Sequence, residues 1–546
     1  MVRCWAWLCL CLLPGWVTAQ DEPLRLAWKN APDSELVSLS KTQVLSREPL
    51  PKDLQAPLGS VWKLFVYAWL VDTGAQEPAY ACQGKSKEEV YCCAVGASIA
   101  RDQALVRSCG LYFEPQRLQL SAADWRHYWR ARNAPDWLQD LNQLQPQTRV
   151  PVAELLQVLA LLPARDTARR VLLDVVLNAA DGAVVGALGG RLRVKTWSWL
   201  ADQDPQSRQG GFAGWLVDGT PLWGGRGTSQ RVLKDYAQAL NQELPDNPPV
   251  DKGRCVEVRL FSRYPLKSVS QGGQPAKPGA LQGDYRVEFA NGNQLDIHSA
   301  GELFLQQDPA AQRLVARLDR EEYVARVLQR EATSEPVEAA KALAVAIRTY
   351  LLQNAGRSGE CLSIDDSSNR QRVAPRPATA QARAIAAWTS DLVLAGTQVT
   401  YHSDLKAPDK LSWQQAVEQA RSGQRYDAIL LHAYPRASLS RWDNPVASCE
   451  PLPAAQEWLL QQRRRWRQPL EQEIGYNEIS QFAVCRLSFG RPYVDRERQR
   501  IYVRGVLSLQ DRLDLTHEYL HLAFEAHPNG QDETYIEGLA RHLLLE

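Results

Sequence analysis

The chain has 546 residues, which is too long for one hydrophobic core and, at roughly 150 residues per domain, predicts about three domains. Its 63 lysines and arginines nearly balance 62 aspartates and glutamates, so a net charge of +1 argues against nucleic acid or an anionic membrane surface as the main partner. A hydrophobic content of 45% with 18 tryptophans excludes a disordered chain.

The first 19 residues have the pattern of an export signal. Met1–Arg3 is a short positive segment, Cys4–Leu13 is apolar, and Val17–Ala19 is typical of a cleavage site. The apolar stretch is shorter than the roughly 20 residues that a membrane span needs, which disfavours a membrane anchor. We therefore expect a periplasmic or secreted protein, cleaved near Ala19, with no membrane span after cleavage.

Eight of the 11 cysteines follow this segment, and an even number in an exported chain permits disulfides. Cys82, Cys92, Cys93 and Cys109 lie close together in the sequence, which predicts local pairing such as Cys82 with Cys92 or Cys93. A zinc site at Cys92–Cys93 is disfavoured because no histidine lies nearby before His127.

Segments rich in proline and glycine divide the rest of the chain. Residues 246–253 are predicted as a linker after a helical stretch at 229–243, residues 271–283 as a loop between strands, and residues 444–453 as a second boundary. We predict an α+β multidomain protein with a signal peptide (1–19) and three parts, 20–247, 250–447 and 448–546.

The first part contains a serine and a lysine three residues apart. Ser60 and Lys63 precede the apolar run 64–71, which is predicted as helical. The two side chains then lie one turn apart on one face, where a desolvated Lys63 amine could take the Ser60 proton. The positive end of the helix dipole would favour the developing alkoxide.

Four segments of this part resemble penicillin-binding proteins and serine β-lactamases: GSVWKLFVYAWL (59–70), ALVRSCGLYF (104–113), LRVKTWSW (192–199) and GGFAGWLVDGTPLW (210–223). The resemblance implies an α/β domain over most of residues 40–240. It also implies that Ser60 is the nucleophile and Lys63 the base, that Ser108 begins the second motif, and that Lys195-Thr196 begins the third motif on an edge strand.

Two residues depart from the motifs of that family. Gly110 stands where the family has asparagine or aspartate, and Trp197 stands where it has glycine. An indole at 197 should crowd the cleft in which an acyl donor would bind. We therefore expect a degenerate binding module here in preference to an active enzyme.

The second part has two predicted helices, 319–330 and 337–352, separated by Glu331–Pro336. Together with Gln371-Arg372-Val373 and AAWTSDLVLAGTQVTYHSD (386–404), they resemble the sporulation stage II protein D family of lytic transglycosylases. The resemblance covers about 255–410 and implies an α+β domain with Glu331 as the catalytic carboxyl, whose pKa burial would raise, and His402-Ser403 as a matching pair. The segment 361–371 has one cysteine and no histidine, which argues against the metal found there in relatives. A fold kept without the activity is the alternative.

The third part contains His517-Glu518-Tyr519-Leu520-His521, a His-Glu-x-x-His motif. On a helix, the two histidines would project to one side and could hold one Zn²⁺, with Glu518 as the general base for a water molecule. Two satisfied structural histidines are the alternative. The segment 499–507 is predicted as a strand before this helix that could bind a peptide in extended form.

Residues 534–540 (TYIEGLA) resemble the Glu-Gly-Leu-Ala helix of gluzincin metallopeptidases. The match implies a small, mostly helical zincin-like domain with Glu537 as the third zinc ligand; Glu533, one turn earlier, is the alternative. Gluzincins also use a Tyr or His to stabilise the oxyanion, and His542 and Tyr535 are the two candidates.

Taken together, the three parts resemble an exported bacterial family of unknown function, the domain of unknown function 2300 type. We expect a peptidoglycan-associated hydrolase with a C-terminal zinc metallopeptidase site whose substrate is either a peptidoglycan stem peptide or a protein. The alternatives are a noncatalytic peptidoglycan-binding scaffold and a lytic transglycosylase that acts through Glu331.

Overall fold

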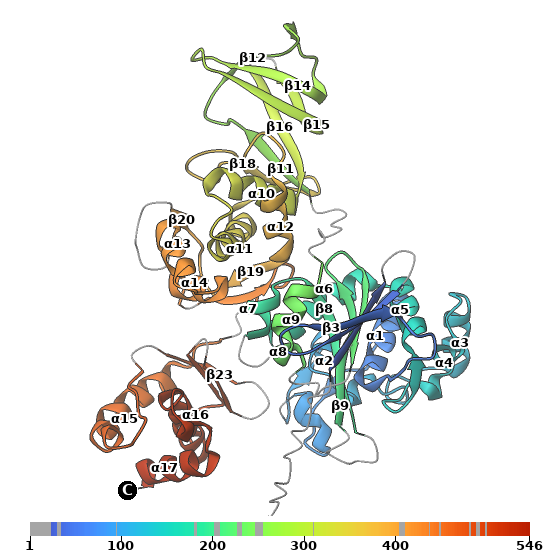
Figure 1. Ribbon diagram of the computed structural model, residues 1–546, viewed down its shortest axis with the longest axis vertical. Helices are drawn as coiled ribbons and strands as arrows, with labels where there is room; N and C mark the ends of the chain where they lie inside the picture. The colour runs from blue at the N-terminus through green and yellow to red at the C-terminus, as the bar shows by residue number, and fades with distance from the viewer. Residues whose placement is uncertain are drawn as a thin grey trace, which may run out of the picture.

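The computed structural model shows three connected parts (Figure 1). It describes residues 23–29, 34–93, 95–178, 183–200, 208–225, 232–245, 255–308, 311–402, 410–435, 437–446, 449–479, 482–487, 492–496 and 499–545. The predicted signal peptide and the predicted linker 246–253 lie outside the described residues. In these ranges, no helix combines the length and the hydropathy that a membrane crossing needs.

The first part is built on an antiparallel sheet of six described strands in the order β3-β2-β1-β10-β9-β8. Strands from the beginning and the end of the first part's sequence meet at the centre of the sheet, because β1 pairs with β10. β8, which carries Lys195, is an edge strand as predicted. The strands are β1 (Leu24–Lys29), β2 (Ser34–Leu39), β3 (Val44–Pro49), β8 (Leu192–Leu200), β9 (Arg208–Leu216) and β10 (Pro221–Gly225), with the short pairs β4 (Gln55–Pro57) and β7 (Arg149–Pro151), and β5 (Tyr80–Ala81) and β6 (Ser98–Ile99).

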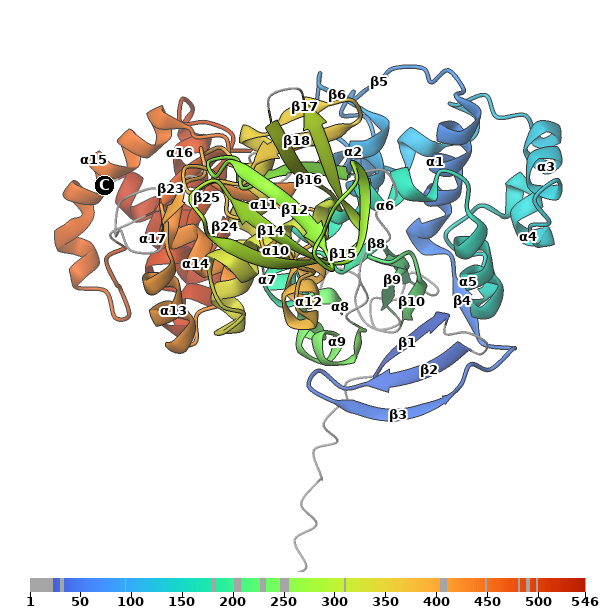
Figure 2. The ribbon, with the colours of Figure 1, turned by 90° about the horizontal axis from the view of Figure 1, so that it is seen from above.

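Side chains alternate between the two faces of this sheet, as the pleat of a strand requires. Ala27 packs in one core with α1, whereas its neighbour Leu26 packs in a second core that continues into the second part. Figure 2 shows α1 and α3–α5 on the side of the first part that lies away from the third part. The helices are α1 (Trp62–Thr73), α2 (Arg101–Val106), α3 (Ala122–Arg130), α4 (Asp136–Gln139), α5 (Val152–Leu161), α6 (Arg165–Leu177), α7 (Ala183–Leu188), α8 (Val232–Asp235) and α9 (Ala237–Glu243).

The second part has a sheet of eight described strands in the order β13-β12-β14-β15-β16-β11-β18-β17, drawn at the top of Figure 1. A disulfide between Cys255 and Cys361 joins the first residues of the parallel neighbours β11 and β18. The strands are β11 (Cys255–Leu260), β12 (Leu266–Gln271), β13 (Gln274–Pro275), β14 (Gly279–Phe289), β15 (Gln294–Asp308), β16 (Ala311–Asp319), β17 (Gly356–Ser358) and β18 (Cys361–Asp365).

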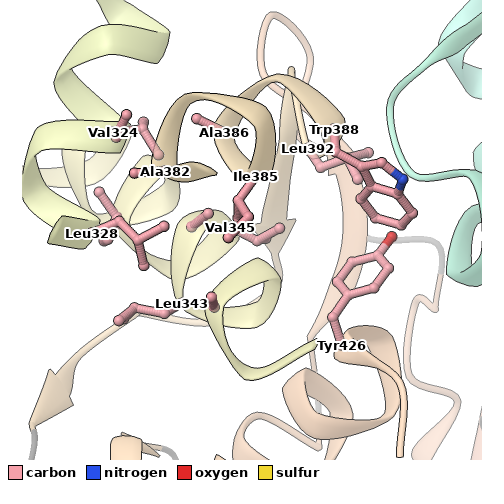
Figure 3. Packing of buried hydrophobic residues seen from close by; sticks show 14 of the residues in the cluster. Val324, Leu328, Leu343, Val345, Ala382, Ile385, Ala386, Trp388, Leu392 and Tyr426 are labelled. Atoms are coloured by element: carbon pink, nitrogen blue, oxygen red, sulfur yellow. The ribbon is translucent and has the colours of Figure 1, made fainter. Parts of the chain in front are cut away.

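Helices of the second part pack below this sheet around α11, whose alanine-rich sequence lets neighbouring helices approach closely (Figures 1 and 3). The helices are α10 (Arg320–Glu331), α11 (Val337–Asn354), α12 (Ala380–Trp388), α13 (Trp413–Arg421) and α14 (Tyr426–Ala433). Two further strand pairs complete this part, antiparallel β19 (Leu392–Ala395) with β22 (Ser438–Arg441) and parallel β20 (Tyr401–His402) with β21 (Leu411–Ser412).

The first and second parts share a buried interface. Asp391 binds guanidinium groups from both, Arg193 at 3.1 Å and Arg320 at 2.6 Å. Trp388 lies at the same contact, beside the ring of Tyr426 and facing the first part (Figure 3). A Cβ at Gly190 would lie 2.1 Å from the Ser390 carbonyl oxygen, so only glycine permits this approach.

The third part packs α15 (Pro453–Glu471), α16 (Leu509–Ala523) and α17 (Glu533–Leu545) around a small sheet in the order β23-β25-β24. Its strands are β23 (Ala483–Arg486), β24 (Tyr493–Asp495) and β25 (Arg500–Val503). Buried Arg500 donates 3.1 Å to Ser438 Oγ and so anchors this sheet to the second part. Ser508 caps α16 together with Asp511 in a capping box, which fixes where the motif helix begins.

The helices predicted at 64–71, 319–330 and 337–352 are present as α1, α10 and α11. The predicted stretch 229–243 contains two short helices, α8 and α9. The prediction of a loop at 271–283 is wrong. A tight turn at Gly272-Gly273 joins β12 to β13, and β14 begins at Gly279. The strand predicted at 499–507 is present as the shorter strand β25. Because β25 pairs with β23 on one side and β24 on the other, neither of its edges is open to a peptide.

Local disulfide pairing is confirmed for the four clustered cysteines. Cys82 pairs with Cys93 and Cys92 with Cys109, while Cys449 pairs with Cys485 in the third part. With Cys255–Cys361, all eight cysteines of the described residues are bonded.

Candidate functional site

The two motif histidines and one carboxylate converge at the contact between α16 and α17. His517 Nε2 lies 3.0 Å from His521 Nε2, and Glu533 Oε2 lies 3.2 Å and 3.5 Å from those two nitrogens. In a tetrahedral zinc site with bonds of about 2.0–2.1 Å, ligand atoms are separated by about 3.3 Å. The three donors therefore lie close enough together to hold one metal ion.

The other nitrogen of each ring is engaged on the far side from this cluster. His521 Nδ1 lies 2.9 Å from the Gly530 carbonyl oxygen, and His517 Nδ1 lies 3.2 Å from Glu537 Oε2. With Nδ1 donating in each ring, both Nε2 atoms keep a lone pair for a metal. A carboxylate or carbonyl behind a histidine is the usual support of a metal ligand.

The structure therefore separates the two candidate carboxylates. Glu533, the alternative third ligand, faces both Nε2 atoms, whereas Glu537 contacts Nδ1 of His517 and forms an ion pair with Arg541. Glu537 is placed to orient His517 and not beside the cluster of donor atoms. Of the two oxyanion candidates, Tyr535 donates its hydroxyl to Glu473 at 2.7 Å, and His542 is exposed near the end of α17.

Glu518 lies on the same helix and is 9% exposed. Burial, reinforced by the negative charges of Glu533 and Asp514, raises its pKa to about 7. A carboxyl with this pKa can both accept and release a proton near neutral pH, as a general base requires. Burial likewise lowers the pKa of His521, which favours the neutral ring that a metal needs.

Arg496, which follows β24, is a further charged residue at this site. Its Nη2 donates 3.1 Å to the Gly530 carbonyl oxygen, which His521 also binds, and its charge acts on Glu518. Sequence reasoning missed Arg496 because it lies 25 residues before His521 in a segment with no recognisable motif.

The predicted serine–lysine pair is assembled in the first part. Ser60 is in the single 3₁₀ turn before α1, and Lys63 Nζ lies 3.2 Å from Ser60 Oγ, 3.2 Å from Ser108 Oγ and 2.7 Å from the Ser108 carbonyl oxygen. Burial lowers the pKa of Lys63 to about 8 against an opposing effect of Glu88. The Lys63 amine therefore lies within reach of the Ser60 hydroxyl, and its lowered pKa increases the neutral fraction that could accept the Ser60 proton.

The third motif surrounds this pair as the sequence predicts. Lys195 is fully buried, its Nζ donates 2.9 Å to the Thr196 carbonyl oxygen, and burial together with Lys63 holds its pKa well below the ordinary value. Trp197 is 2% exposed and lies against the turn that carries Ser60, since a Cβ at Gly59 would be 2.8 Å from Trp197 Cβ. A Cβ at Gly110 would lie 3.6 Å from Lys63 Cε and 3.7 Å from Lys63 Nζ, so a side chain at this position would start in contact with the lysine.

Glu331 ends α10 in the second part and is bound by one arginine. Its Oε1 accepts a 2.7 Å hydrogen bond from the Arg372 backbone N–H, and its Oε2 lies 3.1 Å from Arg372 Nη2. The hydrogen bond from the Arg372 guanidinium to the Glu331 carboxylate raises the pKa of Arg372. Of the matching His402-Ser403 pair, Ser403 lies outside the described residues, as does the side chain of His402.

The three candidate centres lie in three different parts of the molecule, near α1, α10 and α16 (Figure 1). Ser60, Lys63 and Ser108 meet in the first part, and His517 and His521 meet in the third, but the fold does not bring the three centres into one site.

Two family descriptions match parts of this chain. Residues 84–206 and 409–529 match the family described as Predicted secreted protein (DUF2300), and residues 310–427 match Stage II sporulation protein (SpoIID). Similar solved structures include a class D β-lactamase from Sebaldella termitidis, with 10% identity, 41% of this chain and 87% of that chain covered, and a TM-score of 0.24. Another is the C-terminal domain of the Bacillus licheniformis BlaR penicillin receptor, with 13% identity, 41% and 91% covered, and a TM-score of 0.28.

The family assignment rests on a relative that spans the whole chain. The protein named Uncharacterized protein YfaQ, from Escherichia coli (strain K12), is 54% identical over 542 residues, which cover 99% of this chain and 98% of YfaQ. The predicted location, periplasmic or secreted, agrees with the description of the matching family. The chain belongs to the same protein family as YfaQ.

Proposed function

We propose that the third part is a zinc-dependent peptidase centre that acts on peptides of the cell envelope. The observation that carries this proposal is the convergence of His517 Nε2, His521 Nε2 and Glu533 Oε2 within 3.0–3.5 Å of one another. The envelope assignment is supported by the secreted family and by the match to a cell-wall-associated domain in the second part. The peptide is either a peptidoglycan stem peptide or a segment of a protein.

Bound Zn²⁺ would supply a Lewis acid at these three donors. Glu518, whose pKa is raised to about 7, would take a proton from the attacking water and deliver it to the leaving amine. Gly530 and Glu537 would hold the two rings through their Nδ1 atoms, and Arg496 would hold the Gly530 carbonyl oxygen that His521 also binds.

The test combines metal analysis with peptide hydrolysis on the full chain. Glu518→Gln should keep its metal and lose hydrolysis, while His521→Ala should lose the metal, the hydrolysis, or both. Glu525→Gln, an exposed substitution just past the same helix, is the matched control and should behave like the native protein. Native protein that binds no zinc, or Glu518→Gln protein that retains full hydrolysis, would overturn the proposal.

A second measurement separates the two carboxylates near the histidines. Glu533→Gln should reduce zinc affinity more than Glu537→Gln, because a supporting carboxylate typically contributes only about 10–100-fold to metal affinity. The reverse order would assign the third ligand to Glu537.

The Ser60 centre supports a second candidate function, acyl transfer to a serine. The specific observation in its favour is the contact of Lys63 Nζ with Ser60 Oγ at 3.2 Å, combined with a Lys63 pKa of about 8. Trp197 restricts the space beside this serine, which favours a small acyl donor or a binding role.

The remaining alternatives give distinct results on purified peptidoglycan. A lytic transglycosylase would release anhydro sugars, and Glu331→Gln would abolish their release. A noncatalytic scaffold would bind the polymer and release nothing from it.

A further inference from the structure

The surroundings of Ser60 include a carboxylate that lies outside the sequence motifs. Glu88 is on η2 (Lys87–Tyr91), a short 3₁₀ helix, and is exposed. A Cβ at Gly110 would lie 3.6 Å from Glu88 Oε2 and 3.7 Å from Lys63 Nζ. The carboxylate and the amine therefore face the same small space, at the position where the sequence departs from the second motif.

Two disulfides fix the segment that carries this carboxylate. Cys82–Cys93 closes the segment on itself, and Cys92–Cys109 ties it to the residue that follows Ser108. The carbonyl and hydroxyl oxygens of Ser108 in turn contact the lysine amine. The carboxylate and both of these oxygens therefore belong to one cross-linked frame around the amine.

The neighbouring glutamate anchors the same segment from inside. Glu89 is buried, and its carboxylate accepts a 2.9 Å hydrogen bond from the Tyr80 hydroxyl. It also accepts hydrogen bonds from the backbone N–H groups of Gln83 and Lys85, each at 3.0 Å. Because one glutamate is turned inward as the anchor, its neighbour Glu88 is held at the surface, beside the amine.

Four segments bring polar or charged groups near the Lys63 amine. The turn before α1 and the segment around residue 108 contribute the uncharged hydroxyls of Ser60 and Ser108. Lys195 on β8 is titratable, but burial and the charge of Lys63 hold its pKa well below the ordinary value, which favours its neutral form. Glu88 supplies negative charge, and it opposes the lowering of the Lys63 pKa by burial.

We propose that Glu88 is a positioning residue for Ser60, whose carboxylate stabilises the positive charge that Lys63 acquires when it takes the Ser60 proton. The amine is neutral before the transfer and cationic after it, so a nearby carboxylate favours the product of the transfer over the reactants. This role rests on the second candidate function, acyl transfer to Ser60, and is independent of the zinc centre.

The reaction that this charge assists is the attack of Ser60 on an acyl donor. The bond from Oγ to the carbonyl carbon forms, the bond to the leaving group breaks, and the leaving group departs with the electron pair of that bond. The hydroxyl proton moves to Lys63 Nζ, which later releases it to the leaving group or to water. The carboxylate itself touches none of the reacting atoms and acts through the amine.

Removing the Glu88 charge should have two opposite effects on the amine. A lower pKa leaves more Lys63 neutral at pH 7, but it also makes the neutral amine a weaker proton acceptor. The pH of half-maximal reaction should therefore fall, and the maximal rate at high pH should fall with it. A purely structural role of Glu88 would change the rate by the same factor at every pH.

The test is the rate of Ser60 labelling by a small fluorophosphonate on the full chain between pH 6 and pH 10, in which the Oγ–P bond forms and fluoride leaves with the electron pair of the P–F bond. For Glu88→Gln the midpoint should fall by about half a pH unit, as expected for the loss of one exposed charge, so that the rate at pH 7 relative to pH 9.5 rises about threefold. Glu88→Asp keeps the charge and should give a midpoint between those of the native protein and Glu88→Gln. Glu114→Gln, at an exposed glutamate of the same part, is the matched control and should have the native profile.

A second measurement assigns the midpoint to the lysine. The ¹³C resonance of Lys63 Cε in the full chain, labelled with ¹³C-lysine, should titrate at a lower pH in Glu88→Gln than in the native protein. Because Glu88 is exposed, its variants should fold, and unchanged circular dichroism would exclude misfolding as the cause of a changed rate.

The possible failures are distinguishable. Native protein without label at Ser60 would overturn the acyl-transfer function and, with it, this role of Glu88. Labelled native protein whose Lys63 midpoint is the same as in Glu88→Gln, or lower, would overturn the role of Glu88 alone. A rate that falls equally at every pH in Glu88→Gln would also overturn it, since the residue would then only support the segment.

Discussion

Replacing Lys63 with arginine should abolish the reactivity of Ser60 that the surrounding geometry favours. Burial lowers the pKa of Lys63 from an ordinary 10.5 to about 8. At pH 7 about 9% of the amine is then neutral, which is about 300-fold more than for an ordinary lysine. Arginine stays protonated at every accessible pH and cannot take the serine proton.

The native protein should therefore react faster as pH rises. The neutral fraction of Lys63 increases about tenfold between pH 6 and pH 7 and levels off above about pH 9, and the rate of Ser60 acylation should follow it. The assay is mass spectrometry of the peptide that contains Ser60 after timed exposure to a small fluorophosphonate. Lys63→Arg should react at least about 100-fold more slowly at pH 8, whereas exposed Lys52→Arg should match the native protein.

Three results would refute this account of the first part. The first is a reaction rate that does not change between pH 6 and pH 9. The second is equal labelling of the native and Lys63→Arg proteins, and the third is label on a residue other than Ser60. Ser60→Ala should carry no label at this position and sets the background.

Other parts of the structure give three further predictions. Burial raises the pKa of Asp174 to about 6 from 3.8, so the folded state binds more protons between these values. Relative to Asp174→Asn, native stability in urea should fall by about 2.4 kcal/mol from pH 4 to pH 7, and a constant difference would contradict this. Cys255 and Cys361 are separated by 106 residues, so replacing both with serine should cost about 4–5 kcal/mol in guanidinium unfolding, a difference that should vanish in reductant. Trp388→Ala should cost about 3–5 kcal/mol and expose the joint between the first two parts to proteolysis; an unchanged melting temperature would show that the indole contributes little.

Local patterns predicted the helices and the groups that they carry. The spacing of His517 and His521 placed both rings on one face of α16, and the Ser60–Lys63 spacing placed an amine next to a hydroxyl, as found. These predictions succeed because residues three or four apart on a helix are neighbours whatever the rest of the fold does.

Features that depend on distant residues could not be predicted in this way. Which of Glu533 and Glu537 lies beside the two Nε2 atoms depends on where α17 begins and how it crosses α16, which no local pattern fixes. Asp391 and Arg193 meet across 198 residues, and Arg496 reaches the histidines from a segment with no motif. The loop predicted at 271–283 is wrong because only Gly272-Gly273 form a turn, whereas other glycines and a proline of this segment lie in the paired strands β13 and β14. Composition alone does not distinguish this arrangement from a loop.

The shared carboxylate of Asp391 also constrains how the family can change over generations. Exchanging the first part for one that lacks Arg193 would leave Asp391 with Arg320 alone, and exchanging the second part for one that lacks Asp391 would remove the carboxylate that Arg193 binds. Either exchange removes one member of an ion-pair network in a largely buried position, which folding tolerates poorly. Substitutions on the two sides of this joint should therefore be inherited as a matched set, and recombination between lineages should preserve the pair as one unit.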